Sequence, residues 1–471
     1  MSQLYFDCLS EIFEYLEDDK FTLHSCILVN RLWCKASVRI FWRDVCYYSS
    51  SNFKTLIACL PNESKEILYK NGINISTSTS KPPTFNYASF CKVLSVEQVY
   101  YKIINLLQSP SHKCKGHIVT REIIQMFMKE ILSLKSLVFS PYHNITFKLF
   151  HESKDCLKNL SDLRCGSNIS TDLFYQLSQI CYNIHTFTLE VGRIVSNGLA
   201  DLISVQRNLK CFNMLLCYYQ RDNNLTNIIP SLMLKLPNTL VKLVLFVRGC
   251  CISLSFIANF LNLQELSLLF KYDNFIDFEK LQYVIFPQLQ VLNISEEHPR
   301  VELLMKFLEN NGKNLKEIYI GSCSDNLLNL VIAKSCPRLR KLFIGIKYNE
   351  LETLKIIFNN CKNLERIKIR CGKNYLSEKD ALKAVAKYSQ NIHELTLYYQ
   401  SRIQFELLPE ELESFFISWT NRISQKSLSL IIVKRYRANS LDTYNENVKI
   451  INKYIKLGVI KKFKVEVDEY I

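Results

Sequence analysis

The sequence predicts an α/β protein in which a small helical segment precedes a long array of stacked strand–helix units. Three observations predict it. A short apolar motif, L-x-x-L-x-L, recurs from residue 134 onward at intervals of about 25 residues. Segments in which apolar residues have helical spacing fill the intervals. Residues 1–47 also carry apolar residues at helical spacing.

Length and composition agree with a folded chain of this kind. The 471 residues are 48% hydrophobic and 22% charged, which is typical of a folded, soluble protein rather than a disordered one. A chain of this length forms either several packed domains or one elongated repeat array. Glycine and proline are few, at 11 each. This scarcity argues against an all-β sandwich and against glycine-rich phosphate loops.

The N-terminal segment is expected to form three short helices. The first has apolar residues at i, i+3, i+4 and i+7, on one face: Leu9, Ile12, Phe13 and Leu16. Acidic residues at 17–19 would end it. Thr22 is expected to cap a second helix over 23–29, and a third would carry the bulky residues between 32 and 42. So small a unit cannot bury all its apolar residues, so it should leave an apolar patch for a partner.

Three pieces of this segment match one family pattern. Residues 4–16 read LYFDCLSEIFEYL, residues 28–33 read LVNRLW, and residues 41–43 read FWR. The F-box pattern is L-P-x-[DE]-x-L-x-x-I-F-x-[YF]-L, then V-[CN]-[RK]-x-W, then a closing W-R. The segment therefore resembles an F-box, and helical spacing alone would not place these pieces together. Tyr5 stands where the family usually has proline.

The resemblance implies a function by tethering. F-box domains bind a Skp-type adaptor, which docks on a cullin scaffold that carries a RING subunit. The chain would then be the substrate-recognition subunit of an SCF-type ubiquitin ligase, with no catalytic residue, metal or cofactor of its own. By similarity, the adaptor-binding surface would consist of Leu4, Tyr5, Leu9, Ile12, Leu16, Val29 and Trp33.

Composition also suggests domain boundaries. We expect the F-box domain to span 1–47 and a helical bridge to span 48–130, interrupted at 74–84 by the polar linker NISTSTSKPPT. The repeat array would follow over 131–420. Residues 421–471 would form a C-terminal repeat and cap, because an open array end exposes apolar surface and a sheet edge.

The recurring motif is typical of leucine-rich repeats, whose period is about 20–29 residues. Twelve copies are recognised, with Ile, Phe, Met or Cys in place of some leucines, and their first residues are Leu134, Leu160, Ile184, Leu209, Leu240, Leu263, Leu289, Leu315, Leu339, Leu364, Ile392 and Leu412. One strand–helix unit cannot bury its apolar face alone, so the units must stack. The strands would form a parallel sheet on the concave side of a solenoid, with the helices outside.

Several elements of the array can be placed individually. Ser377 and Asp380 form a capping box at the start of a helix that continues to residue 387. Similar helices are expected over 301–308 and 350–358. A helix over 445–457 and a strand over 459–467 would close the array.

Eighteen cysteines are interpreted as repeat residues rather than as disulfides or nucleophiles. Cys181, Cys336 and Cys361 each stand three residues before the first apolar residue of a motif. This placement resembles the cysteine-containing repeats that are common behind F-boxes. Such thiols behave as small buried hydrophobes.

Residues between the motif leucines should face the concave side, because side chains alternate along a strand. Four neighbouring repeats then bring cationic and aromatic side chains together, none of them in the core: Tyr319, Lys341, Phe343, Arg366, Lys368, Arg370 and Tyr398. Arginine suits bidentate recognition of carboxylates and phosphates. One interpretation is therefore a binding site for an acidic or phosphorylated protein substrate; the other is a solvated basic face.

Other classes of function lack support. The net charge of +15 is dispersed, so no nucleic-acid partner is expected. No signal peptide or membrane-spanning run is visible, which indicates the cytosol or nucleus. His112, Cys114 and His117 lack a fourth ligand for a metal. No common enzyme motif occurs. A stand-alone leucine-rich-repeat scaffold without a ligase role remains the alternative, and Tyr5 favours it.

Overall fold

The computed structural model describes residues 5–73, 75, 83–107, 115–139, 153–217, 223–249, 251–271, 275–321, 323–372, 374–399, 407–422, 426–435 and 440–467. The chain divides into two units. The first comprises Met1–Leu215 with Lys235–Thr239, and the second comprises Leu216–Leu234 with Leu240–Ile471. The division falls within strand β5 (Cys211–Cys217), not at a boundary expected from the sequence.

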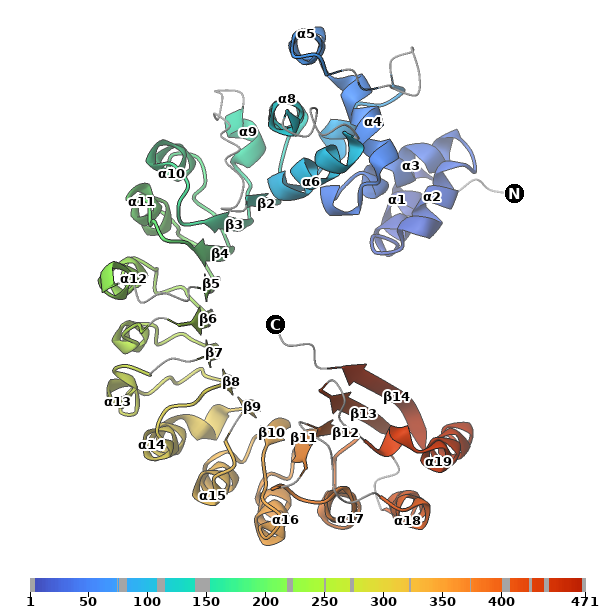
Figure 1. Cartoon of the computed structure of the whole chain (residues 1–471), viewed down its shortest axis with the longest axis vertical. Helices are drawn as coiled ribbons and strands as arrows, with labels where there is room; N and C mark the ends of the chain where they lie inside the picture. The colour runs from blue at the N-terminus through green and yellow to red at the C-terminus, as the bar shows by residue number, and fades with distance from the viewer. Residues whose placement is uncertain are drawn as a thin grey trace. The chain divides into compact units, whose positions relative to one another are not determined.

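In each unit the strands follow one another in chain order. Fourteen strands lie in the order β1 to β14 in the described residues, and the pairings from β1 to β4 and from β6 to β14 are parallel (Figure 1). The strands of the first unit are β1 (Val93–Ser95), β2 (Ser136–Phe139), β3 (Asp162–Gly166), β4 (Thr186–Val191) and most of β5. Those of the second are β6 (Lys242–Arg248), β7 (Glu265–Lys271), β8 (Val291–Glu296), β9 (Glu317–Ile320), β10 (Lys341–Ile344), β11 (Arg366–Cys371), β12 (Glu394–Tyr399), β13 (Leu428–Lys434) and β14 (Ile460–Val467).

Helices connect the strands, as the alternation of motif and helical spacing predicts. The first unit contains α1 (Phe6–Glu14), α2 (Lys20–Ile27), α3 (Arg31–Phe41), α4 (Ser50–Cys59), α5 (Asn62–Lys70), α6 (Val96–Leu106), α8 (Gly116–Glu130), α9 (Ser153–Leu157), α10 (Thr171–Ser178) and α11 (Gly198–Ser204). The second contains α12 (Asn223–Met233), α13 (Phe278–Leu281), α14 (Val301–Asn311), α15 (Asn326–Ser335), α16 (Leu351–Asn360), α17 (Glu378–Tyr388), α18 (Pro409–Thr420) and α19 (Asn445–Lys456). Within each unit the helices of the repeats cover one face of the sheet (Figure 1). The prediction of a leucine-rich-repeat fold is confirmed.

The repeat motif sets the register of the strands. Each strand from β2 to β12 begins two residues after the first residue of its motif, and the motif residues point into the core: Leu339, Leu342 and Ile344 are at most 2% exposed. Leu342 pairs with Ile318 on one side and with Ile367 on the other. Equivalent apolar positions of successive repeats therefore stack, and each repeat buries the apolar face of its neighbour.

The twelfth motif is wrong. Leu412 lies in helix α18, not in a strand. Pro409 occupies the first turn of this helix. The buried residues of α18 have helical spacing: Leu412, Phe415, Phe416 and Trp419. Ile417, the third apolar residue of the supposed motif, is 49% exposed. The strand that follows β12 is β13, which was expected near the end of the array.

The sheet begins earlier than expected. The described part of residues 48–130, predicted to be a helical bridge, contains α4, α5, α6 and α8 but also strand β1, which pairs with β2 through Leu94 and Leu137. Cys91 and Leu94 are both fully buried and take the places of the first two motif leucines. This copy has Cys91 in the leading position and Val96 in the last, so it keeps only one of the three leucines of the motif. Most of the expected linker at 74–84 lies outside the described residues.

The second and third N-terminal helices start at polar caps. The Asp19 carboxylate accepts a hydrogen bond from the Thr22 backbone N–H (3.0 Å), and the Asn30 side chain does the same for Trp33 (2.9 Å). Asp19, not Thr22, therefore caps the second helix, which begins three residues earlier than expected. A small core joins the three helices: Leu9, Phe13, Leu23, Cys26, Ala36 and Ile40.

Trp42 and Arg43 connect these helices to the sheet within the first unit. The Trp42 ring is buried against Tyr48 and Tyr87, with centroid distances of 5.0 and 4.4 Å. The Arg43 carbonyl accepts hydrogen bonds from the backbone N–H groups of Lys92 and Val93, at 2.7 and 3.1 Å. The closing W-R pair therefore anchors the three-helix segment to the first strand.

The cysteines placed before the motifs are buried thiols. Cys336 and Cys361 are at most 1% exposed, and the Cys361 thiol donates to the Cys336 carbonyl of the preceding repeat at 3.5 Å. Burial raises the pKa of Cys361 to about 11 and that of Cys181 to about 12. These thiols stay protonated near neutral pH and act as packing residues of the array.

A buried carboxyl group joins the last repeats. Glu378, at the start of α17, is 5% exposed and accepts a hydrogen bond from the Tyr399 hydroxyl. The backbone N–H groups of Leu407 and Leu441 also donate to it. Burial raises the pKa of Glu378 to about 7 in spite of these hydrogen bonds.

This raised pKa predicts a pH-dependent stability. Because the folded state holds the proton more tightly, the contribution is fully present below the ordinary pKa of 4.5 and is lost as pH rises through about 7. The shift corresponds to roughly 3 kcal/mol. We expect thermal unfolding to show a larger loss of stability between pH 5 and 8.5 in the wild type than in Glu378→Gln. Superimposable pH profiles would contradict the assignment.

Candidate protein-binding surfaces

The three-helix segment exposes apolar side chains at several positions of the family pattern. Tyr5 is 83% exposed, Ile12 on α1 is 48% exposed, and Val29 between α2 and α3 is 57% exposed. Solvent-exposed large apolar residues grouped on so short a segment are typical of an interaction surface. Leu4, which the resemblance adds to the set, lies outside the described residues.

Three residues of the expected adaptor surface lie at or near the core. Leu9 is 1% exposed and belongs to the core of the three helices, so its assignment to a surface is corrected. Leu16 and Trp33 are partly buried against the same core, and Trp33 meets the Phe13 ring edge-on at 5.2 Å. Ile12 lies at one edge of the apolar face, about 60° around the helix from Leu9 and about 100° from Phe13. Leu9 and Phe13 turn inward, and Ile12 is left outside.

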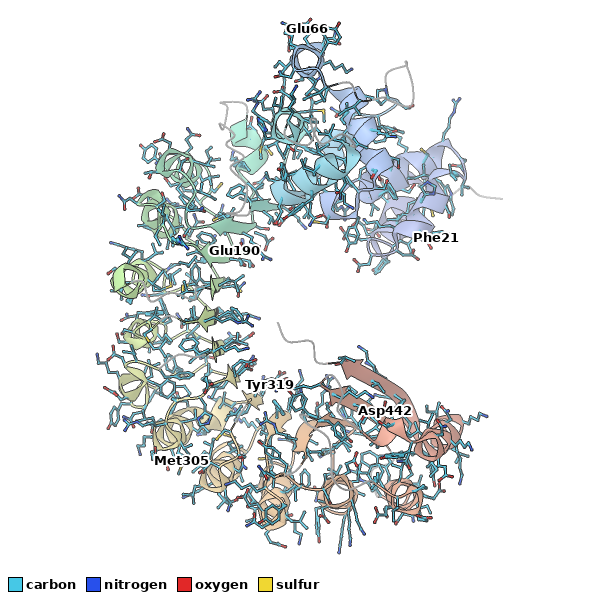
Figure 2. All side chains as sticks on the ribbon, in the orientation of Figure 1. Phe21, Glu66, Glu190, Met305, Tyr319 and Asp442 are labelled. Carbon is cyan, nitrogen blue, oxygen red and sulfur yellow. The ribbon has the colours of Figure 1, made fainter. Side chains whose placement is uncertain are left out.

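Sequence reasoning missed other exposed apolar residues nearby. Leu28 is 74% exposed and directly precedes Val29, while Tyr15 and Phe21 are 92% and 86% exposed. Phe21 lies at the outer side of α2 (Figure 2). The spacing could have indicated Leu28, because it stands five and two residues after Leu23 and Cys26, the buried residues of α2, and not at the helical spacing of three or four.

Tyr5 adopts the backbone conformation that proline would enforce. Its φ is −66° and its ψ is 153° at the N-cap of α1. Proline fixes φ near −65°. The chain therefore enters α1 in the geometry that the family's proline favours, although the residue itself differs.

Charge pairing fixes the end of α1. The Arg43 guanidinium donates two hydrogen bonds to the Glu14 carboxylate, at 2.6 Å each, and lies 3.1 Å from Glu17. This bidentate contact lowers the pKa of Glu14 and raises that of Arg43. Arg43 thus holds α1 through its side chain and strand β1 through its carbonyl.

The second surface is the polar strand face, defined here as the outward residues of β9 to β12: Glu317, Tyr319, Lys341, Phe343, Arg366, Lys368, Arg370, Glu394 and Tyr398. The register places Glu317, Lys341, Arg366 and Glu394 side by side in one row. Tyr319, Phe343 and Lys368 form the next row. Tyr319 lies on the side of the sheet away from the helices, whereas Met305 lies on the helix layer (Figure 2).

Two of the cations on this face have carboxylate neighbours. Lys341 lies 2.7 Å from Glu317, and Arg366 lies 3.9 Å from Glu394. The Glu317 carboxylate also accepts a hydrogen bond from the Tyr319 hydroxyl at 3.1 Å; burial and this neighbour raise the pKa of Tyr319 to about 12. Glu317 and Glu394 therefore offset part of the positive charge that the sequence led us to expect on this face.

Lys368 lies between aromatic rings. Its ammonium group is 4.6 Å from the centroid of Phe343 and 4.5 Å from that of Tyr398, and the two rings meet edge-on at 5.8 Å. Cation–π contacts at these distances are attractive and hold the cation in place. Tyr398 itself is buried, at 5% exposed.

Arg370 points outward from β11 but is buried on the strand face, which corrects the expectation that it faces a ligand. It is 4% exposed, donates to the Gly321 carbonyl and to the Tyr375 hydroxyl (3.0 Å), and lies over the Tyr375 ring. Gly321 and Gly345 follow β9 and β10 and carry no side chain, and a Cβ on either would have a neighbour at 3.0 Å or closer. A Cβ on Gly345 would lie 2.9 Å from the Tyr375 ring, so this glycine allows Tyr375 to pack at the end of β10, where its hydroxyl accepts from Arg370.

Metal and membrane functions gain no support from the described part of the chain. No group of three or more metal-ligating side chains occurs there, and His112 and Cys114 lie outside it. Within the same residues, none of the helices has the length and apolar character that crossing a bilayer requires.

Comparisons with known proteins add resemblances of low identity. No family model and no curated protein matches the chain. Similar solved structures include the leucine-rich repeat-containing protein LegL7 from Legionella pneumophila, with 13% identity over 64% of this chain and 95% of that one and a TM-score of 0.34. The yeast Rad7 and Elc1 complex has 15% identity over 96% and 91%, with a TM-score of 0.42. The mouse RP105/MD-1 complex has 12% identity over 72% and 55%, with a TM-score of 0.39.

Proposed function

We propose that this chain is a non-catalytic substrate-recognition subunit of an SCF-type cullin–RING ubiquitin ligase. Its three-helix segment would bind a Skp-type adaptor, and its polar strand face would bind a protein substrate. The compartment would be the cytosol or the nucleus, where such ligases act. The observation that carries the proposal is the exposure of Ile12 and Val29 at positions where the F-box resemblance places adaptor contacts.

Two further features support the tethering role. The N-cap of α1 has the backbone geometry of a proline, so the substitution at Tyr5 leaves the chain entry unchanged. Arg43 and Trp42 fasten the three helices to the first strand of the repeat array. A fixed connection between the three helices and the repeat array suits a receptor that must hold a substrate at a defined position relative to the adaptor.

The polar strand face would suit a partly acidic or phosphorylated segment. Arg366 is exposed, and its guanidinium is 3.9 Å from Glu394, which is a loose contact that an incoming anion could replace. The aromatic rings around Lys368 would provide apolar contact beside this charge. Arg370 would act indirectly, by fixing Tyr375 and the end of β9.

Reconstituted ubiquitylation tests this function. Proteins captured from a lysate by the wild-type chain are incubated with adaptor, cullin–RING scaffold, activating and conjugating enzymes, and ubiquitin. We expect a captured protein to be modified, and its capture to be reduced at least about tenfold by Arg366→Glu with Lys368→Glu, and to weaken with salt. An unchanged set of partners, insensitive to salt, would show that the substrate binds elsewhere.

The alternative is a leucine-rich-repeat scaffold without a ligase role. The observation in its favour is Tyr5, since the family's proline contacts the adaptor and Tyr5 presents a different, highly exposed side chain. Under this alternative the strand-face variants would still lose partners. No captured protein would be ubiquitylated in an adaptor-dependent way.

A further inference from the structure

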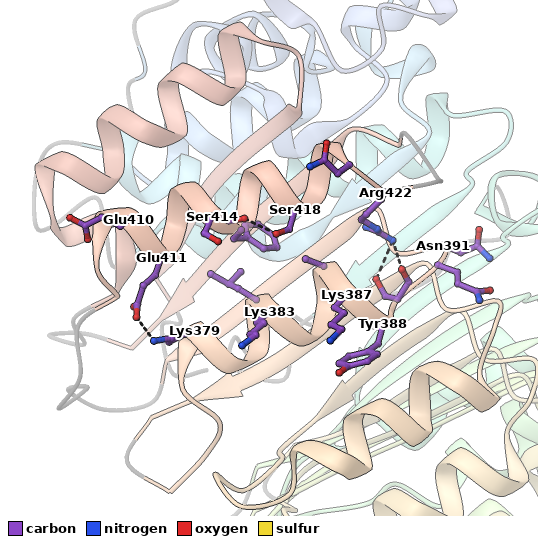
Figure 3. Close-up of a pocket in the computed structure, with 16 residues that line it drawn as sticks. Lys379, Lys383, Lys387, Tyr388, Asn391, Glu410, Glu411, Ser414, Ser418 and Arg422 are labelled. Carbon is purple, nitrogen blue, oxygen red and sulfur yellow. Dashed lines mark hydrogen bonds and ion pairs between the residues drawn. The ribbon is translucent and has the colours of Figure 1, made fainter.

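A groove on the helix layer of the second unit has no role in the proposed function. It lies between α17 and α18 and has a volume of about 1040 Å³ (Figure 3). Its buried lining residues include Leu382, Ala386 and Phe415, so its base is apolar. Ser414 and Ser418 border it from α18. Small side chains at these facing positions leave the space between the two helices open.

One side of the groove is a row of lysines. Lys379, Lys383 and Lys387 are spaced four residues apart on α17 and are all exposed, so they share one helix face. Successive members of the row are about 6 Å apart along the helix axis. Arg422, just beyond α18, lies at the end of the groove near Tyr388 (Figure 3).

Most of this positive charge lacks a carboxylate partner. Lys379 lies 2.5 Å from Glu411, which is the one ion pair recorded among the described residues that line the groove. Lys383 has no ion pair or hydrogen bond within the described structure, and Lys387 contacts only the Tyr388 ring there, at 5.3 Å.

Arg422 is positioned by neutral groups. Its guanidinium donates to the carbonyls of Ser389 and Ile392, at 2.7 and 3.4 Å, and lies 4.0 Å from the Trp419 ring centroid. These contacts hold the arginine in place and leave its charge uncompensated by a carboxylate. The part of the groove toward the C-terminal end of α17 is therefore a fixed cationic site over an apolar base.

We propose that this groove binds an extended acidic segment of a partner protein, with carboxylates on alternate residues. In an extended chain, side chains on one side repeat every ~6.6 Å, which matches the ~6 Å spacing of the lysines. The apolar base would receive the aliphatic parts of the segment. This inference does not depend on the ubiquitin-ligase proposal.

The test is fluorescence anisotropy with a labelled peptide of twelve alternating Glu and Ser residues. A peptide with the same composition but all Glu residues in one block serves as the spacing control. We expect the wild-type chain to bind the alternating peptide more tightly than the block peptide. The exposed double variant Lys383→Glu with Lys387→Glu should weaken this binding at least about tenfold.

A matched variant separates the groove from general charge effects. Lys449→Glu with Lys456→Glu makes the same change of charge on the exposed face of α19. It should change the affinity less than about threefold. Equal losses in the two variants, no loss in the groove variant, equal binding of the two peptides, or preferential binding of a single-stranded RNA of equal charge would each overturn the proposal.

Discussion

Ile12→Asp and Val29→Asp should each reduce binding of a Skp-type adaptor by roughly a hundredfold or more. Fully burying an Ile or Val side chain contributes ~1.5–3 kcal/mol, and a charge buried at the contact adds a further penalty. Both residues are exposed in the free chain, at 48% and 57%, so the fold should tolerate the change. Isothermal titration calorimetry with purified adaptor measures the effect.

Tyr69→Asp is the matched control for these variants. Tyr69 lies on α5 of the same unit and is 74% exposed, but it falls outside the family pattern. This variant should bind the adaptor as the wild type does. Equal affinity of Ile12→Asp, Val29→Asp and wild type would remove the three-helix segment as the adaptor contact. Leu9→Asp is unsuitable, because Leu9 belongs to the core and its loss would unfold the segment.

Arg370→Glu should destabilise the second unit by roughly 3 kcal/mol or more. The substitution places a carboxylate beside the Gly321 carbonyl, removes the hydrogen bond to Tyr375 and leaves buried polar groups unpaired. For a unit of this size the expected fall in the melting temperature is about 6 °C or more. Differential scanning calorimetry measures the change.

Arg366→Glu makes the same change of charge four residues earlier on the same strand. Arg366 is exposed and pairs only loosely with Glu394. Its substitution should alter stability by no more than about 0.5 kcal/mol. Similar melting temperatures for the two variants would mean that Arg370 has no structural role and faces a ligand after all.

The repeat strands could be predicted because their burial pattern is local. A strand that contributes to a stacked parallel sheet must place apolar residues at fixed positions. Each motif from Leu134 to Ile392 has apolar residues at these positions within a few consecutive residues. Leu412 satisfied the same spacing by coincidence, since Leu412 and Phe415 also lie on one face of a helix. Pro409 and the two glutamates after it were the signal for the helix start.

The side chains of the candidate surfaces were harder to predict, because their exposure depends on other elements. Whether Leu9 or Ile12 turns inward depends on where α2 and α3 pack against α1. The spacing of apolar residues on α1 does not indicate the positions of these two helices. Arg370 alternates outward along β11 as expected, yet Tyr375 and the Gly321 carbonyl, both beyond the strand ends, bury its side chain. The groove beside α17 likewise depends on small residues of α18, which lies next to α17 in the fold although the two helices are separate in the sequence.

Direct binding of the wild-type chain to a purified Skp-type adaptor tests the central claim most directly. The two proteins are mixed at micromolar concentration and analysed by size-exclusion chromatography with light scattering. If the three-helix segment is a working F-box, the proteins will elute together with the mass of a one-to-one complex. Elution as two separate species would contradict the account and leave the leucine-rich-repeat scaffold as the function that the structure supports.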